Sequence, residues 1–284
     1  MKLKPRQILQ GTKELIKTSA FRYGYNVRQD LYSNDKVMDD LYRKRFPETS
    51  LSERRFYNIG AASFRHKYWK NVDIICEGYT SDAANVDVEY DITKNAPLPI
   101  DASSAEVVYT SHTVEHVFDE NAQNLFCEAY RILKPGSVFR VTCPDIDLAI
   151  HAYRNNDLSF FRAVGVHEAT LEECLAQYCS SAIAPDSPEK MTPADLKGYF
   201  KNSPDLLSAV DHLSKISNRE LQKKNPGNHV NWYNKEKIVR MLKEADFKRI
   251  HLSGQQQSLE PVLRDFRYFD STSPMRSVYV DAVK

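Results

Sequence analysis

Short apolar runs that end at turn residues predict a series of β-strands in the first half of the chain. Phe56–Ile59 is an apolar run that stops at Gly60, as a buried strand entering a turn does. Four further runs, some continuous and some alternating between apolar and polar residues, predict strands at 71–75, 86–90, 106–109 and 138–142. Most of this region is therefore expected to belong to one sheet.

Helical periodicity lies between these strands and after them. The segment 121–133 places its apolar side chains on one helical face, and the Lys-Pro-Gly triplet at 134–136 is expected to end that helix. Asn234 can cap a second amphipathic helix, because its side chain can accept from the free N–H groups of the first turn. Shorter helices are expected near residues 9–16 and at 39–46.

Strands that alternate with helices indicate βαβ units and a parallel sheet. Two short strands at 250–252 and 277–283 follow the last helix and favour an antiparallel edge strand. The predicted fold class is α/β, a Rossmann-like, mostly parallel sheet. We expect an N-terminal helical segment (1–53), a sheet core (54–150), a helical insertion (151–228) and a C-terminal return to the core (229–284).

Composition and charge narrow the class of protein. The 284 residues are 42% hydrophobic and 27% charged, which is typical of a globular domain. No run approaches the ~18 apolar residues of a membrane span, and the N-terminus has no apolar secretory segment, so no membrane partner is expected. The pI of about 7.6 does not favour nucleic acid as a partner. Five cysteines without a CxxC pair predict a reduced, cytoplasmic protein.

Small, acidic and polar residues follow the predicted strands, where ligands bind in open α/β sheets. A turn of small residues starts at Gly60 after the first strand, Asp73 follows the second, and Asp91 follows the third. An acidic residue after the second strand can accept from both ribose hydroxyls, and one after the third can accept from an adenine amino group. Thr110, Ser111 and His112 follow the fourth strand. This arrangement predicts a site for a nucleoside-like cofactor.

Three stretches resemble the class I S-adenosyl-L-methionine (SAM)-dependent methyltransferases. They are YNIGAASFRHKYWKNVDI, PLPIDASSAEVVYTSHTVEH and AYRILKPGSVFRVTCPD, and HVNWYNKEKIVRMLKEADFKRI is similar to that branch's last helix and strand. The resemblance covers residues 54–150 and 226–284. It implies a class I methyltransferase fold, SAM as the cofactor, and transfer of a methyl group to a small-molecule acceptor. Family members of this branch often modify sugars or other small metabolites, so a saccharide or a phosphorylated precursor is one acceptor that the resemblance allows.

The resemblance also implies site residues. The expected cofactor-binding residues are Gly60, Ala61, Ala62, Ser63, Phe64, Asp73, Ile74, Asp91, Ile92, Thr110, Ser111 and His112. If the acceptor atom is a hydroxyl or an amine, a neutral histidine is a natural general base. The candidates, in order, are His112, His229 and His167. Tyr23, Tyr25, Trp232 and Tyr233 are expected to form walls for the acceptor between the insertion, the N-terminal segment and the sheet edge.

Two features keep other functions open. The first loop of the family usually carries two or three glycines, and here Ala61 and Ala62 follow Gly60. A protein with the SAM fold that binds ligand without catalysis is therefore the alternative. His112-Thr113-Val114-Glu115-His116 also matches the HxxEH pattern of zinc hydrolases. That pattern requires a helix, here it follows a strand, and no third ligand is evident, so we expect no metal.

Overall fold

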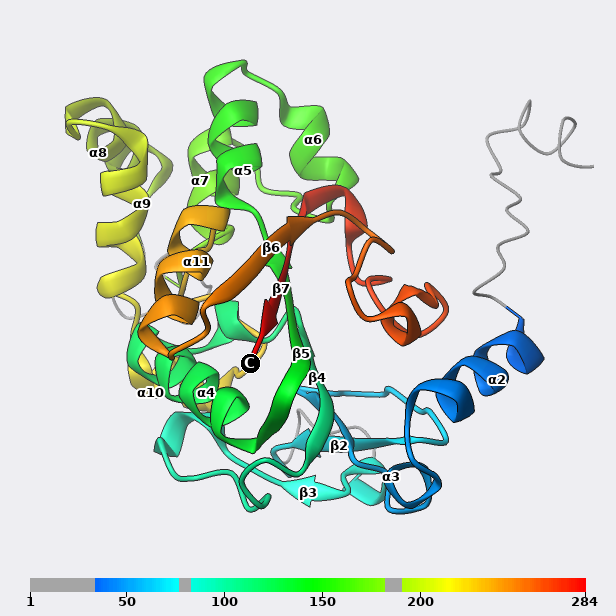
Figure 1. The fold of residues 1–284 in the computed structure, drawn as a ribbon. Helices are drawn as coiled ribbons and strands as arrows, with labels where there is room; N and C mark the ends of the chain where they lie inside the picture. Colours follow the sequence, from blue (N-terminus) through cyan, green and yellow to red (C-terminus); the bar gives the residue numbers. More distant parts are fainter. Residues whose placement is uncertain (1–33, 77–82, 182–190) are drawn as a thin grey trace, which may run out of the picture.

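The computed structural model describes residues 34–76, 83–181 and 191–284, which form one seven-stranded sheet with helices on both sides (Figure 1). The sheet order is β3-β2-β1-β4-β5-β7-β6. Adjacent strands from β3 to β5 pair in parallel, and β7 is antiparallel to both of its neighbours. This confirms the predicted Rossmann-like class I methyltransferase fold, with the antiparallel strand placed between β5 and the edge strand β6. The strands are β1 (Phe56–Ile59), β2 (Trp69–Asp73), β3 (Val88–Glu89), β4 (Ala105–Ser111), β5 (Leu133–Pro144), β6 (Arg249–Ser253) and β7 (Ser277–Val283).

Strand β5 begins earlier than the expected strand at 138–142 and includes the Lys-Pro-Gly triplet. Ala105 of β4 pairs with Leu133, whereas Val107 pairs with Val138, so the register shifts within this stretch. The extra residues of β5 bulge out of the ladder at the triplet, where proline cannot donate a ladder hydrogen bond. The preceding helix does end before the triplet, as predicted.

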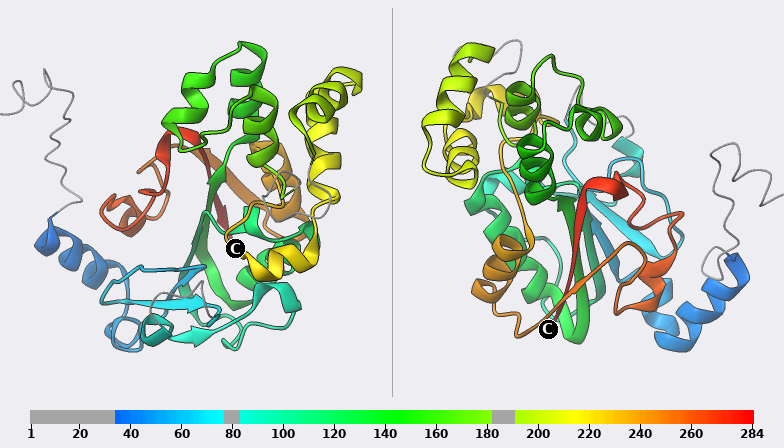
Figure 2. Two further views of the ribbon diagram at one scale, coloured as in Figure 1. Left: turned by 180° about the vertical axis from the view of Figure 1, so that it is seen from behind. Right: turned by 90° about the horizontal axis from the view of Figure 1, so that it is seen from above.

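Two helices cover one face of the sheet and three chain segments cover the other (Figures 1 and 2). On the first face, α4 (Asp119–Ile132) and α11 (Lys235–Glu244) pack their apolar stripes against the central strands. The predicted cap is present, because Asn234 accepts from the backbone N–H of Lys237 at 2.9 Å. On the second face, α2 (Asp35–Arg45), α3 (Glu48–Ser52) and the 254–276 segment share an aromatic-rich core with β1, β2 and β4.

A helical layer lies beyond the carboxyl end of β5 (Figure 1). Its helices α5 to α9 bury an apolar cluster of their own, separate from the two clusters on the sheet. Among the described residues, no helix combines the length and apolar character that crossing a membrane requires. The helices of this layer and its return are α5 (Ile146–Arg154), α6 (Leu158–Ala163), α7 (Leu171–Gln177), α8 (Pro193–Asn202), α9 (Leu206–Lys215) and α10 (Arg219–Lys224).

A buried arginine anchors the 254–276 segment to the sheet. Arg140 of β5 donates to both carboxylate oxygens of Asp270, at 2.9 and 2.6 Å, and to Asp281 of β7 at 2.8 Å. All three side chains are completely buried. Although burial alone would lower the pKa of Arg140, its hydrogen bonds and charge pairing with Asp270 raise it above the ordinary value. The guanidinium therefore stays charged and holds two carboxylates that have no access to water.

We expect Arg140→Met to lower the free energy of unfolding by about 3–5 kcal/mol, because Asp270 and Asp281 would remain buried without their cation. Urea unfolding at neutral pH measures this change. The triple variant Arg140→Met, Asp270→Asn, Asp281→Asn removes the uncompensated charges and should recover part of the loss. Equal stability of Arg140→Met and the unmodified chain would show that the ion triad does not hold the segment.

Candidate active site

The loop after β1 packs tightly against the end of β4. Gly60 has a φ of +71°, and a Cβ placed there would lie 2.2–2.8 Å from side-chain atoms of Thr113. Glycine is therefore required at this position both for its conformation and for the close contact. Ala62 also has a positive φ, of +45°, a region that glycine adopts at lower cost. The backbone of Ala62 is thus strained, which the sequence did not indicate.

Asp73 holds this loop against the end of β2. Its Oδ2 accepts from the backbone N–H of Ala62 and its Oδ1 accepts from that of Ile74, both at 2.8 Å. Burial raises the pKa of Asp73, and the two backbone hydrogen bonds act in the opposite direction. Each oxygen retains acceptor capacity, because a carboxylate oxygen has two lone pairs. The carboxylate can therefore shape the loop and still accept from a bound hydroxyl.

Two cavities lie along the carboxyl edge of the strands. One, of about 520 Å³, is lined by seven of the predicted cofactor residues, namely Gly60, Ala61, Ala62, Ser63, Phe64, Ser111 and His112. The other, of about 240 Å³, is lined by three more, namely Ile74, Asp91 and Ile92. Thr113 lines the second cavity and follows His112 of the first, so the end of β4 borders both. The volume of the first cavity is typical of small-ligand sites, and that of the second lies just below the usual range.

Two predicted cofactor residues line neither cavity. Thr110 is completely buried, and its hydroxyl donates to the carbonyl of Ile59 at 2.9 Å, which ties β4 to β1. Asp73 is not part of either lining but holds the loop that lines the first cavity. Asp91 lines the smaller cavity but also accepts from the backbone N–H of Thr93 at 3.0 Å, where it caps a short 3-10 helix.

The two predicted acceptor residues that the structure describes, Trp232 and Tyr233, line neither cavity. Tyr233 is fully buried in the sheet core, and Trp232 packs against the helical layer, where its ring N–H donates to Asp211 at 3.2 Å. Tyr23 and Tyr25 lie outside the described residues. His167 is exposed on the loop between α6 and α7 and lines neither cavity. The roles assigned to these five side chains remain predictions.

His112 is held in an unusual conformation at the end of β4. Its φ is +50°, and its backbone N–H donates to the carbonyl of Thr142 at 2.9 Å. The imidazole Nε2 lies 2.8 Å from Ser277 Oγ, and Nδ1 lies 3.2 Å from Oε1 of Glu115. Non-glycine residues with strained backbones gather at functional sites, and this ring lines the larger cavity. A carboxylate at Nδ1 is the arrangement that orients a histidine base.

Glu115 is the centre of a buried histidine cluster. The residue is 1% exposed, and its carboxylate lies near His112, His116 and His229. Burial alone would raise the pKa of Glu115, but the contact with His112 and the neighbouring histidines lower it to about 2. Burial also lowers the pKa of His229 to about 4, so this imidazole is neutral near pH 7.

The HxxEH string does not form the helix of a zinc hydrolase. Residues Val114–His116 form a short 3-10 helix, and His112 lies before it with a left-handed backbone, so the two histidines do not share one α-helical face. The sequence indicated no third ligand, but the fold brings His229 beside Glu115 and His116. Only the long-range fold makes this neighbour visible, because 113 positions separate His116 from His229.

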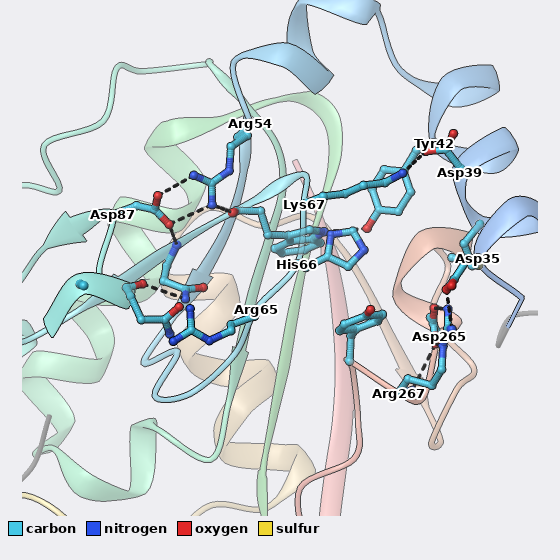
Figure 3. Close-up of a pocket in the computed structure, with 16 residues that line it drawn as sticks. Asp35, Asp39, Tyr42, Arg54, Arg65, His66, Lys67, Asp87, Asp265 and Arg267 are labelled. Atoms are coloured by element: carbon cyan, nitrogen blue, oxygen red, sulfur yellow. Dashed lines mark hydrogen bonds and ion pairs between the residues drawn. The ribbon is translucent and has the colours of Figure 1, made fainter. Parts of the chain in front are cut away.

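A third and larger cavity, of about 660 Å³, lies on the other side of the first loop (Figure 3). Its wall includes His66 and four ion pairs, in which Arg54 contacts Asp87, Lys67 contacts Asp39, and Arg267 contacts both Asp35 and Asp265. Arg65, Arg267 and Tyr268 line both this cavity and the 520 Å³ cavity. None of these residues is among the site residues predicted from the sequence.

Comparison with known proteins gives one partial family match. Residues 67–141 match the family described as "Methyltransferase domain", which is about a quarter of the chain. The match begins just before β2 and ends within β5, so it contains Asp73, Asp91 and the HxxEH string. The sequence matches no curated protein.

Solved structures are similar over most of the chain at low identity. A SAM-dependent methyltransferase from Thermotoga maritima is 13% identical with a TM-score of 0.40, covering 89% of this chain and 98% of that one. One from Mesorhizobium loti is 16% identical with a TM-score of 0.39, covering 90% and 100%. One from Archaeoglobus fulgidus is 14% identical with a TM-score of 0.37, covering 88% and 94%. Because the TM-scores are below 0.5, these similarities give no evidence about the activity of this chain.

The first loop generates one prediction on stability. Gly60→Ala should destabilise the protein by about 1–3 kcal/mol more than Gly136→Ala, because overpacking adds to the backbone strain. Gly136 is a matched control, since its φ is +83° and a Cβ there meets no atom within 4 Å. Ala62→Gly should be neutral or stabilising. Urea unfolding of the three variants measures the difference, and equal losses for the two alanine variants would contradict the Thr113 contact.

The large cavity generates a prediction on pH dependence. Burial, together with the charges of Lys67 and Arg267, lowers the pKa of His66 from 6.5 to about 4. Between pH 6.5 and 4 the unfolded chain binds a proton at this residue and the folded chain does not, so stability falls as the pH falls. His66→Phe keeps a ring against Tyr268 and Tyr42 but removes this proton.

The stability of His66→Phe should therefore fall less steeply over this interval, by at most about 1.4 kcal/mol per pH unit. Urea unfolding at half-unit pH steps measures both slopes. His251→Phe, on the exposed edge strand, is the control and should keep the slope of the unmodified chain. Identical slopes for His66→Phe and the unmodified chain would contradict the lowered pKa.

Proposed function

We propose that this protein binds SAM along the carboxyl edge of its sheet and transfers a methyl group to a hydroxyl or amine of a small-molecule acceptor. The observation that carries the proposal is the arrangement of the first loop, Asp73, Asp91 and His112, which follow four adjacent strands along one edge. The match of residues 67–141 to the methyltransferase domain family supports the same reading.

The residues along this edge suit different parts of the cofactor. The turn at Gly60 brings backbone close to the 520 Å³ cavity, and Asp73 offers free acceptor capacity for ribose hydroxyls. Ile74, Asp91 and Ile92 line the smaller cavity, which is mostly apolar and suits an adenine ring. SAM, when bound, supplies a methyl group activated by its sulfonium. The main contribution of the protein is then to align acceptor and methyl group.

His112 is the proposed general base. The ionised Glu115, 3.2 Å from Nδ1, favours the tautomer with the proton on Nδ1. The lone pair is then on Nε2, which is the nitrogen that can take a proton from the acceptor. Nε2 lies 2.8 Å from Ser277 Oγ, so the acceptor hydroxyl or amine would take the place of this contact. Glu115 acts through His112 as a positioning residue. His229 and His167 remain the next candidates.

The large cavity favours a polar acceptor. It shares the side chains of Arg65, Arg267 and Tyr268 with the 520 Å³ cavity, so an acceptor that reaches the methyl group can extend over them. Its wall combines ion pairs with the ring of His66, a surface that can hydrogen-bond many hydroxyl groups. Saccharides and phosphorylated precursors are therefore the first acceptors to test.

The test compares SAM binding in Asp73→Asn and in Asp246→Asn by calorimetry. Asp73→Asn should weaken binding at least tenfold, because hydrogen bonds to a charged group contribute about 1.5–3 kcal/mol. The side chain of Asp246 is 71% exposed, and its position in the sequence is far from the residues of this edge. The Asp246→Asn variant should therefore bind SAM as the unmodified chain does. Thermal unfolding of each variant excludes loss of fold. Unchanged affinity in Asp73→Asn would remove the ribose assignment.

Turnover is measured separately, as release of S-adenosylhomocysteine when the protein is mixed with SAM and each acceptor of a panel. His112→Ala should lower turnover by about 10²–10⁴ while SAM affinity is retained, as expected for loss of a general base. His112→Asn distinguishes the base from a side chain that only donates a hydrogen bond, since an amide cannot take the proton. Tight SAM binding without turnover on any acceptor would favour the alternative, a non-catalytic protein with the SAM fold.

A further inference from the structure

Glu115, His116 and His229 bring three potential ligand atoms together beneath the carboxyl edge of the sheet. One carboxylate oxygen and one nitrogen of each imidazole all lie within 4.8 Å of one another. Nε2 of His116 lies 3.8 Å from Oε1 of Glu115, and the two imidazole centroids are 5.0 Å apart. This spacing leaves room for one ion between the donors, since ligand distances to zinc are about 2.0–2.2 Å.

Backbone carbonyls orient both imidazoles. Nδ1 of His116 lies 3.2 Å from the carbonyl oxygen of Asn228, and Nδ1 of His229 lies 3.0 Å from that of Tyr178. A carbonyl only accepts, so each Nδ1 carries the proton and each Nε2 keeps its lone pair. Metal-binding histidines are usually held in this way, with the second nitrogen donating to a carbonyl or carboxylate.

The carboxylate of Glu115 lacks partners that its burial requires. Neither oxygen has a well-aligned hydrogen bond from any described residue, although the side chain is only 2% exposed. Buried polar groups are rarely left unsatisfied, and a buried charge without a partner is costly. Nδ1 of His112 lies 3.2 Å from Oε1, and Oε2 is left without a hydrogen-bond partner among the described residues. We infer that Glu115, His116 and His229 form a binding site for a divalent transition metal, with Zn²⁺ as the best match.

The ligand set favours zinc over magnesium or calcium. Two imidazoles and one carboxylate suit zinc and similar transition metals, whereas magnesium and calcium prefer oxygen ligands. Three protein ligands leave the fourth tetrahedral position open, as in catalytic zinc sites. The geometry nevertheless differs from a zinc hydrolase, because the third ligand comes from the segment after α10 and His112 is not a ligand.

Access and position are consistent with a functional site. The His116 side chain is 22% exposed and lines the 240 Å³ cavity, which gives an ion a path from solvent. Glu115 contacts His112, which lines the 520 Å³ cavity. An oxygen or nitrogen of the acceptor could occupy the open position, and a bound metal lowers the pKa of such a group. This role rests on the proposed function, but the metal site itself does not.

The test is titration of the full chain, freed of metal with a chelator, with ZnCl₂ in a calorimeter. We expect one equivalent to bind. His229→Ala and His116→Ala should each weaken binding by at least about 100-fold, more than the 10–100-fold typical of losing an outer-shell partner. His251→Ala removes an exposed histidine of β6 and should bind as the unmodified chain does. The site is overturned if the unmodified chain binds zinc weakly or at less than one equivalent. It is also overturned if the two ligand variants bind zinc as the unmodified chain does.

Cobalt gives a second measurement on the same proteins. Co²⁺ in a tetrahedral site absorbs visible light far more strongly than hydrated Co²⁺, so one equivalent should produce an intense visible band that both ligand variants lose. Circular dichroism checks their fold, and His229→Gln replaces His229→Ala if the latter unfolds. SAM binding is measured separately on each. Zinc binding without SAM binding supports the metal site and overturns the proposed function; SAM binding without zinc binding does the reverse.

Discussion

The ion triad of Arg140, Asp270 and Asp281 determines where the 254–276 segment can form its part of the candidate site. A guanidinium in the centre of β5 can remain charged there only if carboxylates surround it, and one of these comes from the 254–276 segment. That contact fixes Asp270 over the sheet, where its backbone N–H donates to the Tyr109 hydroxyl at 2.8 Å. The neighbouring side chains of this segment, Arg267 and Tyr268, then form the wall between the two larger cavities.

Backbone conformations with positive φ occur at three positions along the same edge of the sheet. Gly60, Ala62 and His112 all have positive φ values, and all three follow the carboxyl ends of the central strands β1 and β4. Strained residues persist only where surrounding contacts hold them, and here Thr113, Asp73 and Glu115 supply those contacts. The candidate site thus has the loop of Gly60 and Ala62 on one side of β4 and the oriented imidazole of His112 on the other.

Local patterns predicted the elements of the sheet well. The run that stops at Gly60, the helical periodicity of 121–133 and the cap at Asn234 each depend on neighbouring residues, so the sequence displays them directly. The bulge in β5 was missed because it depends on the register with β4.

Contacts between distant residues could not be predicted from these patterns. Arg140 meets Asp270 and Glu115 meets His229 only after the chain has folded back on itself, and no local period signals either pair. The predicted cofactor residues were chosen because strand ends of a parallel sheet share one edge, and the structure places ten of them along two cavities there. The predicted acceptor residues Trp232 and Tyr233 had no such rule behind them, and the structure places them in packed surroundings.

Strands β1 and β2 are parallel neighbours joined only by residues 60–68, fewer than the dozen that a crossover with a helix needs. No helix of that connection covers the adjoining face, and α2 together with the 254–276 segment covers it instead. These two segments come from opposite ends of the described chain. During synthesis, β2 and the turn with Asp91 therefore leave the ribosome long before residues 254–276 do. This edge of the sheet is made early, and the wall that Arg267 and Tyr268 form is completed last.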